Sequence, residues 1–136
     1  MAIDYGTKRV GVAVTDALQI IANPLDTVHS KDVVEYIASY HQKNPIETLV
    51  VGLPKHLDGS INELENHIKL FIKKIKEKLP NLNISRIDER FTSKMAFQSM
   101  IDGGLKKQQR ANKETIDKVS ATIILQSYLQ TKQNGF

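Results

Sequence analysis

The sequence contains no cysteine among its 136 residues. Disulfide bonds, thiolate zinc sites and cysteine nucleophiles are therefore excluded, which fits the reducing cytoplasm where we expect the protein to reside. Long apolar runs are also missing, because the run at residues 10–14 is far shorter than the ~20 residues that a membrane-spanning helix needs. An aspartate at position 4 is not typical of the N-terminus of a signal peptide. We expect no membrane partner.

With 40% hydrophobic and 25% charged residues, the composition is that of an ordinary globular protein. The length predicts a single domain over residues 1–136, large enough to bury roughly two-thirds of the surface of its unfolded chain. The 19 basic and 15 acidic residues give a net charge of +4, which favours a polyanionic partner. Many proteins without such a partner carry as much charge, so both readings stay open.

The N-terminal part of the chain is predicted to form three strands, of which the first two make a hairpin. Residues 3–5 lead through the turn-like residues 6–9 into the β-branched run 10–15. The third strand is expected around residues 20–28, where Pro24 indicates an edge or a bend. The sheet therefore begins with antiparallel strands.

Helices and strands are predicted to alternate after this point. Ser30 is expected to cap a helix that ends before Asn44, and the apolar run 48–53 is typical of a strand covered on both faces. Ser60 and Glu63 form a capping-box pattern ahead of a long amphipathic helix whose lysines point to a solvated surface.

The last strand is predicted at residues 83–91, followed by a short helix that Gly103 and Gly104 stop. The final helix is expected from about Thr115 to Tyr128 or beyond. The predicted fold class is α/β, with the element order βββ-α-β-α-β-α-α and helices on the faces of a mixed sheet.

Acidic residues occur at three places where a solvated surface acid is not expected: Asp4 in the first strand, Asp88-Glu89 at a strand end, and Asp117 in the first turn of the last helix. Carboxylates are the protein ligands that Mg²⁺ prefers. Each acid also has a structural reading: Asp4 as a turn initiator and Asp117 as a partner of the helix dipole. Spacing alone does not bring the three together.

Adjacent strand residues point to opposite faces, so at most one of Asp88 and Glu89 shares a site with Asp4. We favour Glu89, because it lies on the same strand face as Ile87 and Phe91. Asp88 is the alternative. The acid that is not used is expected to pair with a neighbouring arginine, Arg86 or Arg90.

Basic residues gather at two places. The turn after the first strand offers Lys8 and Arg9 for contacts to a phosphate, although this signal is weak alone. A second basic group comprises Lys106, Lys107, Arg110 and Lys113. It is read either as an electrostatic footprint for nucleic acid or as a solubilising loop. The four histidines have no partner at helical spacing, so a histidine metal site is not expected.

Four segments, in order and spanning nearly the whole chain, resemble the YqgF/RuvX family, bacterial relatives of Holliday-junction resolvases with an RNase H-like fold. They are AIDYGTKRVGVAVTD (residues 2–16), VVGLP with DG (50–54 and 58–59), DERFTS (88–93) and DKVSATIILQSYL (117–129). The family's first strand has several more residues before the aspartate, so we expect that the sequence given starts inside that strand.

The resemblance implies an RNase H-like fold with a five-stranded sheet and a nuclease that matures the 5′ end of 16S ribosomal RNA from its precursor. It also implies a site of three carboxylates for Mg²⁺ or Mn²⁺, falling on Asp4, Asp88-Glu89 and Asp117. Resolvases proper carry an acid where this chain has Gly52-Leu53-Pro54, so the second carboxylate is expected from the next strand. Arg90 joins the basic residues expected to hold the substrate backbone.

Three functional readings follow. The first is a metal-dependent nuclease acting on structured RNA, the pre-16S ribosomal RNA, with Asp4, Glu89 and Asp117 as catalytic and metal-binding residues. The second is a junction-specific nuclease acting on branched DNA with the same chemistry. The third is a non-catalytic RNA-binding module in ribosome assembly. The oligomeric state, monomer or homodimer, is left open by the sequence.

Overall fold

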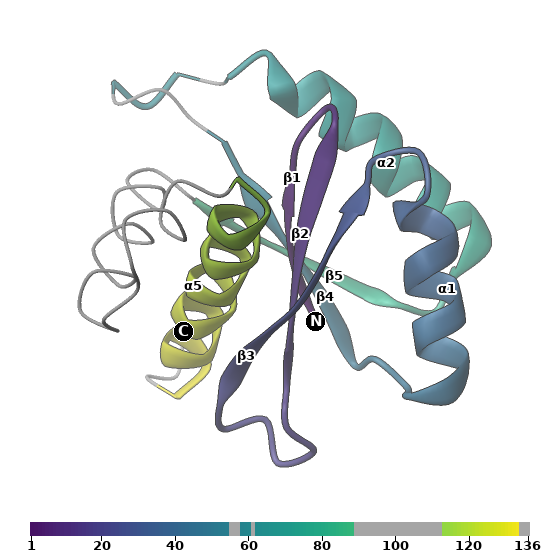
Figure 1. The fold of residues 1–136 in the computed structure, drawn as a ribbon, viewed down its shortest axis with the longest axis vertical. Coiled ribbons are helices and arrows are strands. Elements are labelled where there is room, and N and C mark those ends of the chain that lie inside the picture. The colour runs from purple at the N-terminus through teal and green to yellow at the C-terminus, as the bar shows by residue number, and fades with distance from the viewer. Residues whose placement is uncertain (55–57, 61, 89–112, 134–136) are drawn as a thin grey trace.

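Five strands form one mixed sheet in the order β3-β2-β1-β4-β5 (Figure 1). The computed structural model describes residues 1–54, 58–60, 62–88 and 113–133. The strands are β1 (Ala2–Tyr5), β2 (Arg9–Thr15), β3 (Ala22–His29), β4 (Thr48–Leu53) and β5 (Asn83–Asp88). β1 pairs with β2 antiparallel and with β4 parallel, so the predicted mixed α/β sheet with an antiparallel start is confirmed.

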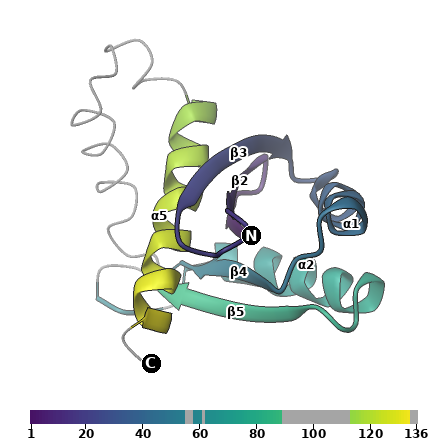
Figure 2. The same ribbon diagram turned by 90° about the horizontal axis from the view of Figure 1, so that it is seen from below.

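Three described helices cover the two faces of this sheet. They are α1 (Val33–Lys43), α2 (Leu64–Lys78) and α5 (Lys113–Gln133). Figures 1 and 2 show α1 and α2 on one face and α5 on the other. None of the helices in the described part of the chain is long and apolar enough to cross a membrane. The short helix predicted before Gly103 lies outside the described residues.

Each face of the sheet has its own hydrophobic core, and β4 contributes to both. Leu49 and Val51 are buried in the core beneath α1 and α2, whereas Val50 is buried against α5. Burying one such side chain stabilises the fold by about 1.5–3 kcal/mol. This placement confirms the prediction that the apolar run of β4 is covered on both faces.

Strand β3 is an edge strand with an irregularity at Pro24, as predicted. Its register against β2 shifts between Val12 and Ala13, where Leu25 is the extra residue between the paired positions. The predicted start of β3 at residue 20 is wrong, because the strand begins at Ala22. The carboxylate of Asp16 accepts hydrogen bonds from the amides of residues 20 and 21, at 2.8 and 3.0 Å, and these bonds hold them in the loop.

Neither predicted helix cap is present. Helix α1 begins after Asp32, and no side chain caps it. Ser30 instead donates its hydroxyl to the carbonyl oxygen of Thr7, at 2.6 Å, and its amide to that of Lys8, at 3.1 Å. The serine hydroxyl is therefore used to tie the end of β3 to the turn between β1 and β2.

Helix α2 begins at Leu64, later than the capping-box pattern predicts. Ser60 bonds to Asp58 in the preceding turn, and the side chain of Asn62 accepts the amide of Leu64 at 2.9 Å. A short side-chain turn at Asn62 thus satisfies an amide at the start of the helix, and the amide of Ser60, which the box would have paired with Glu63, donates to Asp58 at 2.8 Å. The lysines of α2 are exposed, as expected for a solvated face: Lys69, Lys73, Lys74, Lys76 and Lys78.

Candidate active site

Asp4 lies near the carboxyl end of β1 on the face that α5 covers. The alternation along β1 establishes this, because Ala2 packs in the α5 core and Ile3 in the opposite core. Tyr5 points to the opposite face and packs against Phe71 of α2, with ring centroids 5.2 Å apart. Burial raises the pKa of Tyr5. The contact between Tyr5 and Phe71 therefore holds the strand end that carries Asp4 from the opposite face of the sheet.

Two glycines flank Asp4 in the sheet. Gly11 is its partner in β2, and one step beyond the pair of Ile3 and Val51 the register of β4 reaches Gly52. On the face of α5, neither neighbour carries a side chain beside the carboxylate of Asp4. Ile87 of β5 is the cross-strand partner of Gly52. Gly11, Asp4, Gly52 and Ile87 therefore form one row across the sheet, which we call the row of Asp4.

Gly11 also allows α5 to approach the sheet at Asp117. A Cβ atom at position 11 would lie 2.0 Å from the backbone carbonyl oxygen of Asp117, a distance that no real side chain tolerates. The contact places Asp117 next to the cross-strand partner of Asp4, although the two acids are far apart in the sequence. Sequence reasoning missed this role of Gly11. An isolated glycine within a β-branched strand is the available signal, because it often marks close backbone approach.

Asp117 lies in the second turn of α5, since the helix begins at Lys113 rather than near residue 115. Dipole stabilisation falls off within the first turn of a helix, so that structural reading of Asp117 is weakened. The predicted packing face of the helix is confirmed: Ser120, Ala121 and Ile124 are buried, and Tyr128 packs beside them.

Arg9 forms an ion pair with Asp117. Its Nε–H group donates to Oδ2 of the carboxylate at 3.0 Å, and the two side chains are 29% and 23% exposed. Arg9 shares the α5 face of β2 with Gly11. The sequence-based prediction assigned Arg9 to phosphate alone and did not anticipate this acidic partner.

Of the acids at the end of β5, only Asp88 is described. Asp88 is exposed and shares strand parity with Ile84, which packs in the core of α1 and α2. Ile87 packs against the α5 core and so lies on the face of Asp4 and Asp117. Glu89 lies outside the described residues.

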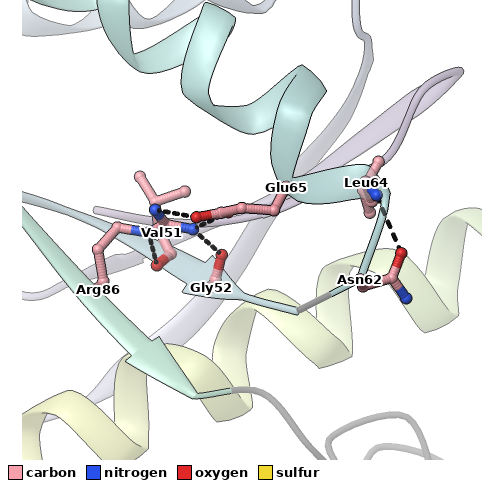
Figure 3. A network of polar contacts seen from close by, with 6 residues as sticks. All are labelled: Val51, Gly52, Asn62, Leu64, Glu65 and Arg86. Atoms are coloured by element: carbon pink, nitrogen blue, oxygen red, sulfur yellow. Dashed lines mark hydrogen bonds and ion pairs between the residues drawn. The ribbon is translucent and has the colours of Figure 1, made fainter. Parts of the chain in front are cut away.

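Arg86 and Arg90 were the two arginines expected to pair with one of these acids; the described partner of the Arg86 guanidinium is Glu65 of α2 (Figure 3), and Arg90 lies outside the described residues. Two nitrogens of Arg86 donate to the two oxygens of Glu65, at 3.0 and 2.6 Å. Further bonds reach the carbonyl oxygens of Val51 and Gly52, at 3.2 and 3.1 Å. This network fixes the end of β4 beside the row of Asp4.

The predicted basic residues are described only in part. Lys8 is exposed on the turn between β1 and β2, whose carbonyl groups Ser30 holds. Lys113 is the first residue of α5. The other predicted contacts lie outside the described residues: Arg90, Lys106, Lys107 and Arg110.

Within the described ranges, no group of three His, Cys, Asp or Glu side chains is placed to hold a metal ion. Asp4 and Asp117 supply two carboxylates on one face of the sheet. Carboxylate oxygens suit a hard divalent cation, which commonly takes its remaining ligands from water and substrate phosphate. The donor chemistry of this pair therefore fits Mg²⁺ or Mn²⁺.

The sheet order and the helices on both faces define an RNase H-like α/β protein. A solved structure described as T. thermophilus RuvC in complex with Holliday junction substrate superposes with a TM-score of 0.59, covering 98% of this chain and 93% of that one. At 15% sequence identity the likeness concerns the fold. A family model described as RuvX, Holliday junction resolvase, matches residues 1–131, and the chain belongs to this family.

Relatives with similar sequences span nearly the whole chain. A protein of Phocaeicola vulgatus is 50% identical over 133 residues, covering 98% of this chain and 96% of its own. A protein of Christiangramia forsetii is 50% identical over 129 residues, covering 95% and 96%. One of Bacteroides fragilis is 45% identical over 133 residues, covering 98% and 96%. All three carry the name "Putative pre-16S rRNA nuclease".

Proposed function

We propose that this chain is a metal-dependent nuclease that hydrolyses phosphodiester bonds in the precursor of 16S ribosomal RNA, at its 5′ end. The observation that carries the proposal is the approach of Asp117 to the row of Asp4, across the side-chain-free position of Gly11. The names of the relatives agree with a hydrolase that acts on nucleic acid. Processing of ribosomal RNA also agrees with a cytoplasmic location.

Asp4 and Asp117 are the residues that would hold Mg²⁺ or Mn²⁺, with Glu89 as the third carboxylate. When bound, the cation would polarise the scissile phosphate and lower the pKa of the attacking water. The protein's own contribution is orientation. Gly11 and Gly52 leave room beside Asp4, and Tyr5 and the Arg86 network hold the strands that line this space.

Glu89 is preferred to Asp88 on the alternation of β5. Ile87 faces α5, and a residue two positions further has the same parity, whereas Asp88 shares the parity of Ile84 on the opposite face. Asp88→Asn should therefore reduce cleavage less than Glu89→Gln.

The substrate backbone would be held by basic residues that border the carboxylates. Lys8 is exposed on the neighbouring turn, and Arg9 lies beside Asp117. Binding through such residues weakens as salt rises, because counterions are released from the nucleic acid. The remaining residues assigned to this contact are Arg90, Lys106, Lys107, Arg110 and Lys113.

The test is Asp4→Asn, assayed for Mg²⁺-dependent cleavage of an RNA that spans the 5′ end of the 16S precursor. We expect cleavage to fall to background, because a neutral amide is a poor ligand for Mg²⁺, while the circular dichroism spectrum and RNA affinity are retained. Glu77→Gln, an exposed acid of α2 on the opposite face, is the matched control and should cleave like the wild type. Full activity of Asp4→Asn would contradict the proposal.

The near alternative is a resolvase of branched DNA, favoured by the description of the family model. Cleavage of a four-way DNA junction in preference to the precursor RNA would select it. A non-catalytic role in ribosome assembly would be selected if the protein bound no Mg²⁺ and neutralising Asp4, Glu89 and Asp117 together left cell growth normal.

A further inference from the structure

The ion pair between Arg9 and Asp117 is joined by a single hydrogen bond, unlike the bidentate pair of Arg86 and Glu65. Only the Nε–H group of Arg9 donates to Asp117, and it reaches a single carboxylate oxygen. The terminal nitrogens of this guanidinium are not used by Asp117, whereas Arg86 uses both of its terminal nitrogens on Glu65. A guanidinium offers five N–H donors, so Arg9 retains donors for a second anion.

Arg9 and a divalent cation would compete for the same carboxylate, that of Asp117. Arg9 neutralises the charge of Asp117, to which it is bonded at 3.0 Å. A divalent cation at Asp117 would meet the positive charge of Arg9 at close range, and like charges at such a distance disfavour each other. Arg9 therefore opposes the binding of a cation for as long as it stays on Asp117.

A substrate phosphate would relieve this conflict. Phosphate accepts bidentate hydrogen bonds from arginine, and such bonds between charged groups are roughly twice as strong as neutral ones. Both side chains of the pair are partly exposed, so an exchange of partner requires no opening of the core.

We propose that Arg9 exchanges Asp117 for a substrate phosphate, and that this exchange couples cation binding to nucleic-acid binding at the site. The inference rests on the proposed metal-dependent nuclease function and adds a regulatory role for Arg9. Without nucleic acid, Arg9 lowers the affinity of Asp117 for the cation. With nucleic acid bound, Arg9 lies on the phosphate, and Asp117 accepts the cation. Linkage requires the cation to strengthen nucleic-acid binding by the same factor.

The first measurement is the affinity of the folded protein for Mn²⁺ alone, by titration calorimetry. Arg9→Gln should bind Mn²⁺ more tightly than the wild type, on the order of fivefold, because the competing charge is gone. Arg9→Lys keeps the charge and should stay close to the wild type. Lys31→Gln removes an exposed charge that no described bond joins to Asp117, and should leave Mn²⁺ affinity unchanged. Circular dichroism confirms folding of each variant.

The second measurement is the affinity for a labelled RNA with phosphorothioate linkages, by fluorescence anisotropy, in EDTA and in Mn²⁺. Mn²⁺ should strengthen RNA binding by the wild type several-fold more than by Arg9→Gln. Equal Mn²⁺ affinity in wild type and Arg9→Gln, or an equal effect of Mn²⁺ on their RNA binding, would overturn the coupling and leave the nuclease proposal standing. A wild type that binds no Mn²⁺ with or without RNA would overturn both.

Discussion

Two arginine–carboxylate pairs lie on opposite faces of the same sheet, and they differ in the burial of the carboxylate and in the number of hydrogen bonds that the arginine makes. Arg86 binds both oxygens of Glu65, and the glutamate side chain is only 5% exposed. Arg9 binds one oxygen of Asp117, and both partners are partly exposed. The first pair also holds two backbone carbonyls of β4, whereas Arg9 makes one described bond to Asp117.

The difference separates an ion pair that holds the fold from one that is free to exchange. Breaking a buried pair leaves an uncompensated charge and is strongly destabilising, whereas partly exposed pairs contribute little. The pair beneath α2 is therefore suited to fix the ends of β4 and β5. The pair beneath α5 lies where a ligand can compete for it.

The largest effect on stability is expected from Arg86→Met, which leaves the carboxylate of Glu65 buried without a partner. The free energy of unfolding should fall by about 3 kcal/mol, measured by urea denaturation. Adding Glu65→Leu should recover most of this loss, because the stranded charge is then removed. A single variant as stable as the wild type would show that Glu65 is not held by Arg86.

Gly11→Ala should give the second-largest loss of stability, because the new methyl group collides with the backbone of α5 at Asp117. We expect a loss of about 2 kcal/mol in the free energy of unfolding. Mn²⁺ affinity should fall as well, since Asp117 must move away from the row of Asp4. Unchanged stability together with unchanged Mn²⁺ affinity would contradict the close packing of α5 on β2.

Replacing each arginine by lysine sharpens the comparison. Arg86→Lys keeps the charge but loses the bidentate contact with Glu65, and the free energy of unfolding should fall by about 1–2 kcal/mol. Arg9→Lys replaces a single hydrogen bond and should change stability by less than about 0.5 kcal/mol. Parallel urea titrations give the two values, and equal losses would remove the distinction between the pairs.

The smallest effect concerns Asp16, a carboxylate held by backbone amides instead of an arginine. Its hydrogen bonds to the amides of Ile21 and Ile20 lower its pKa below the ordinary value of 3.8. The unfolded chain therefore binds the proton more readily, so the stabilisation is present above pH 3.8 and is lost as the pH falls through the lowered pKa. Asp16→Ala should be slightly less stable at pH 7, and the difference should shrink in acid. A difference that grows in acid would refute this account.

Much of the fold followed from local patterns. The hairpin, the edge position of Pro24 and the doubly covered strand β4 were predictable because alternation and apolar runs report directly on burial. The helix starts were not, since Ser30 and Ser60 have polar partners nearby that compete with the capping role. Which partner a serine chooses depends on contacts that the sequence does not display.

The candidate site was predictable in its residue types and not in its contacts. Asp4 and Asp117 were identified as unusual acids, but their proximity depends on a helix backbone that packs on Gly11. Arg9 was expected at phosphate, and its bond to Asp117 joins residues that are 108 positions apart. Either Arg86 or Arg90 was expected to pair with an acid at the end of β5, and packing on α2 gives Arg86 the partner Glu65.

The central claim is that Asp4 and Asp117 bind one divalent cation, and a crystal soaked in Mn²⁺ tests it most directly. The account predicts an anomalous peak on the α5 face of the sheet, within ligand distance of both carboxylates and beside Gly11. An empty α5 face at saturating Mn²⁺, with Arg9 still bonded to Asp117, would contradict it.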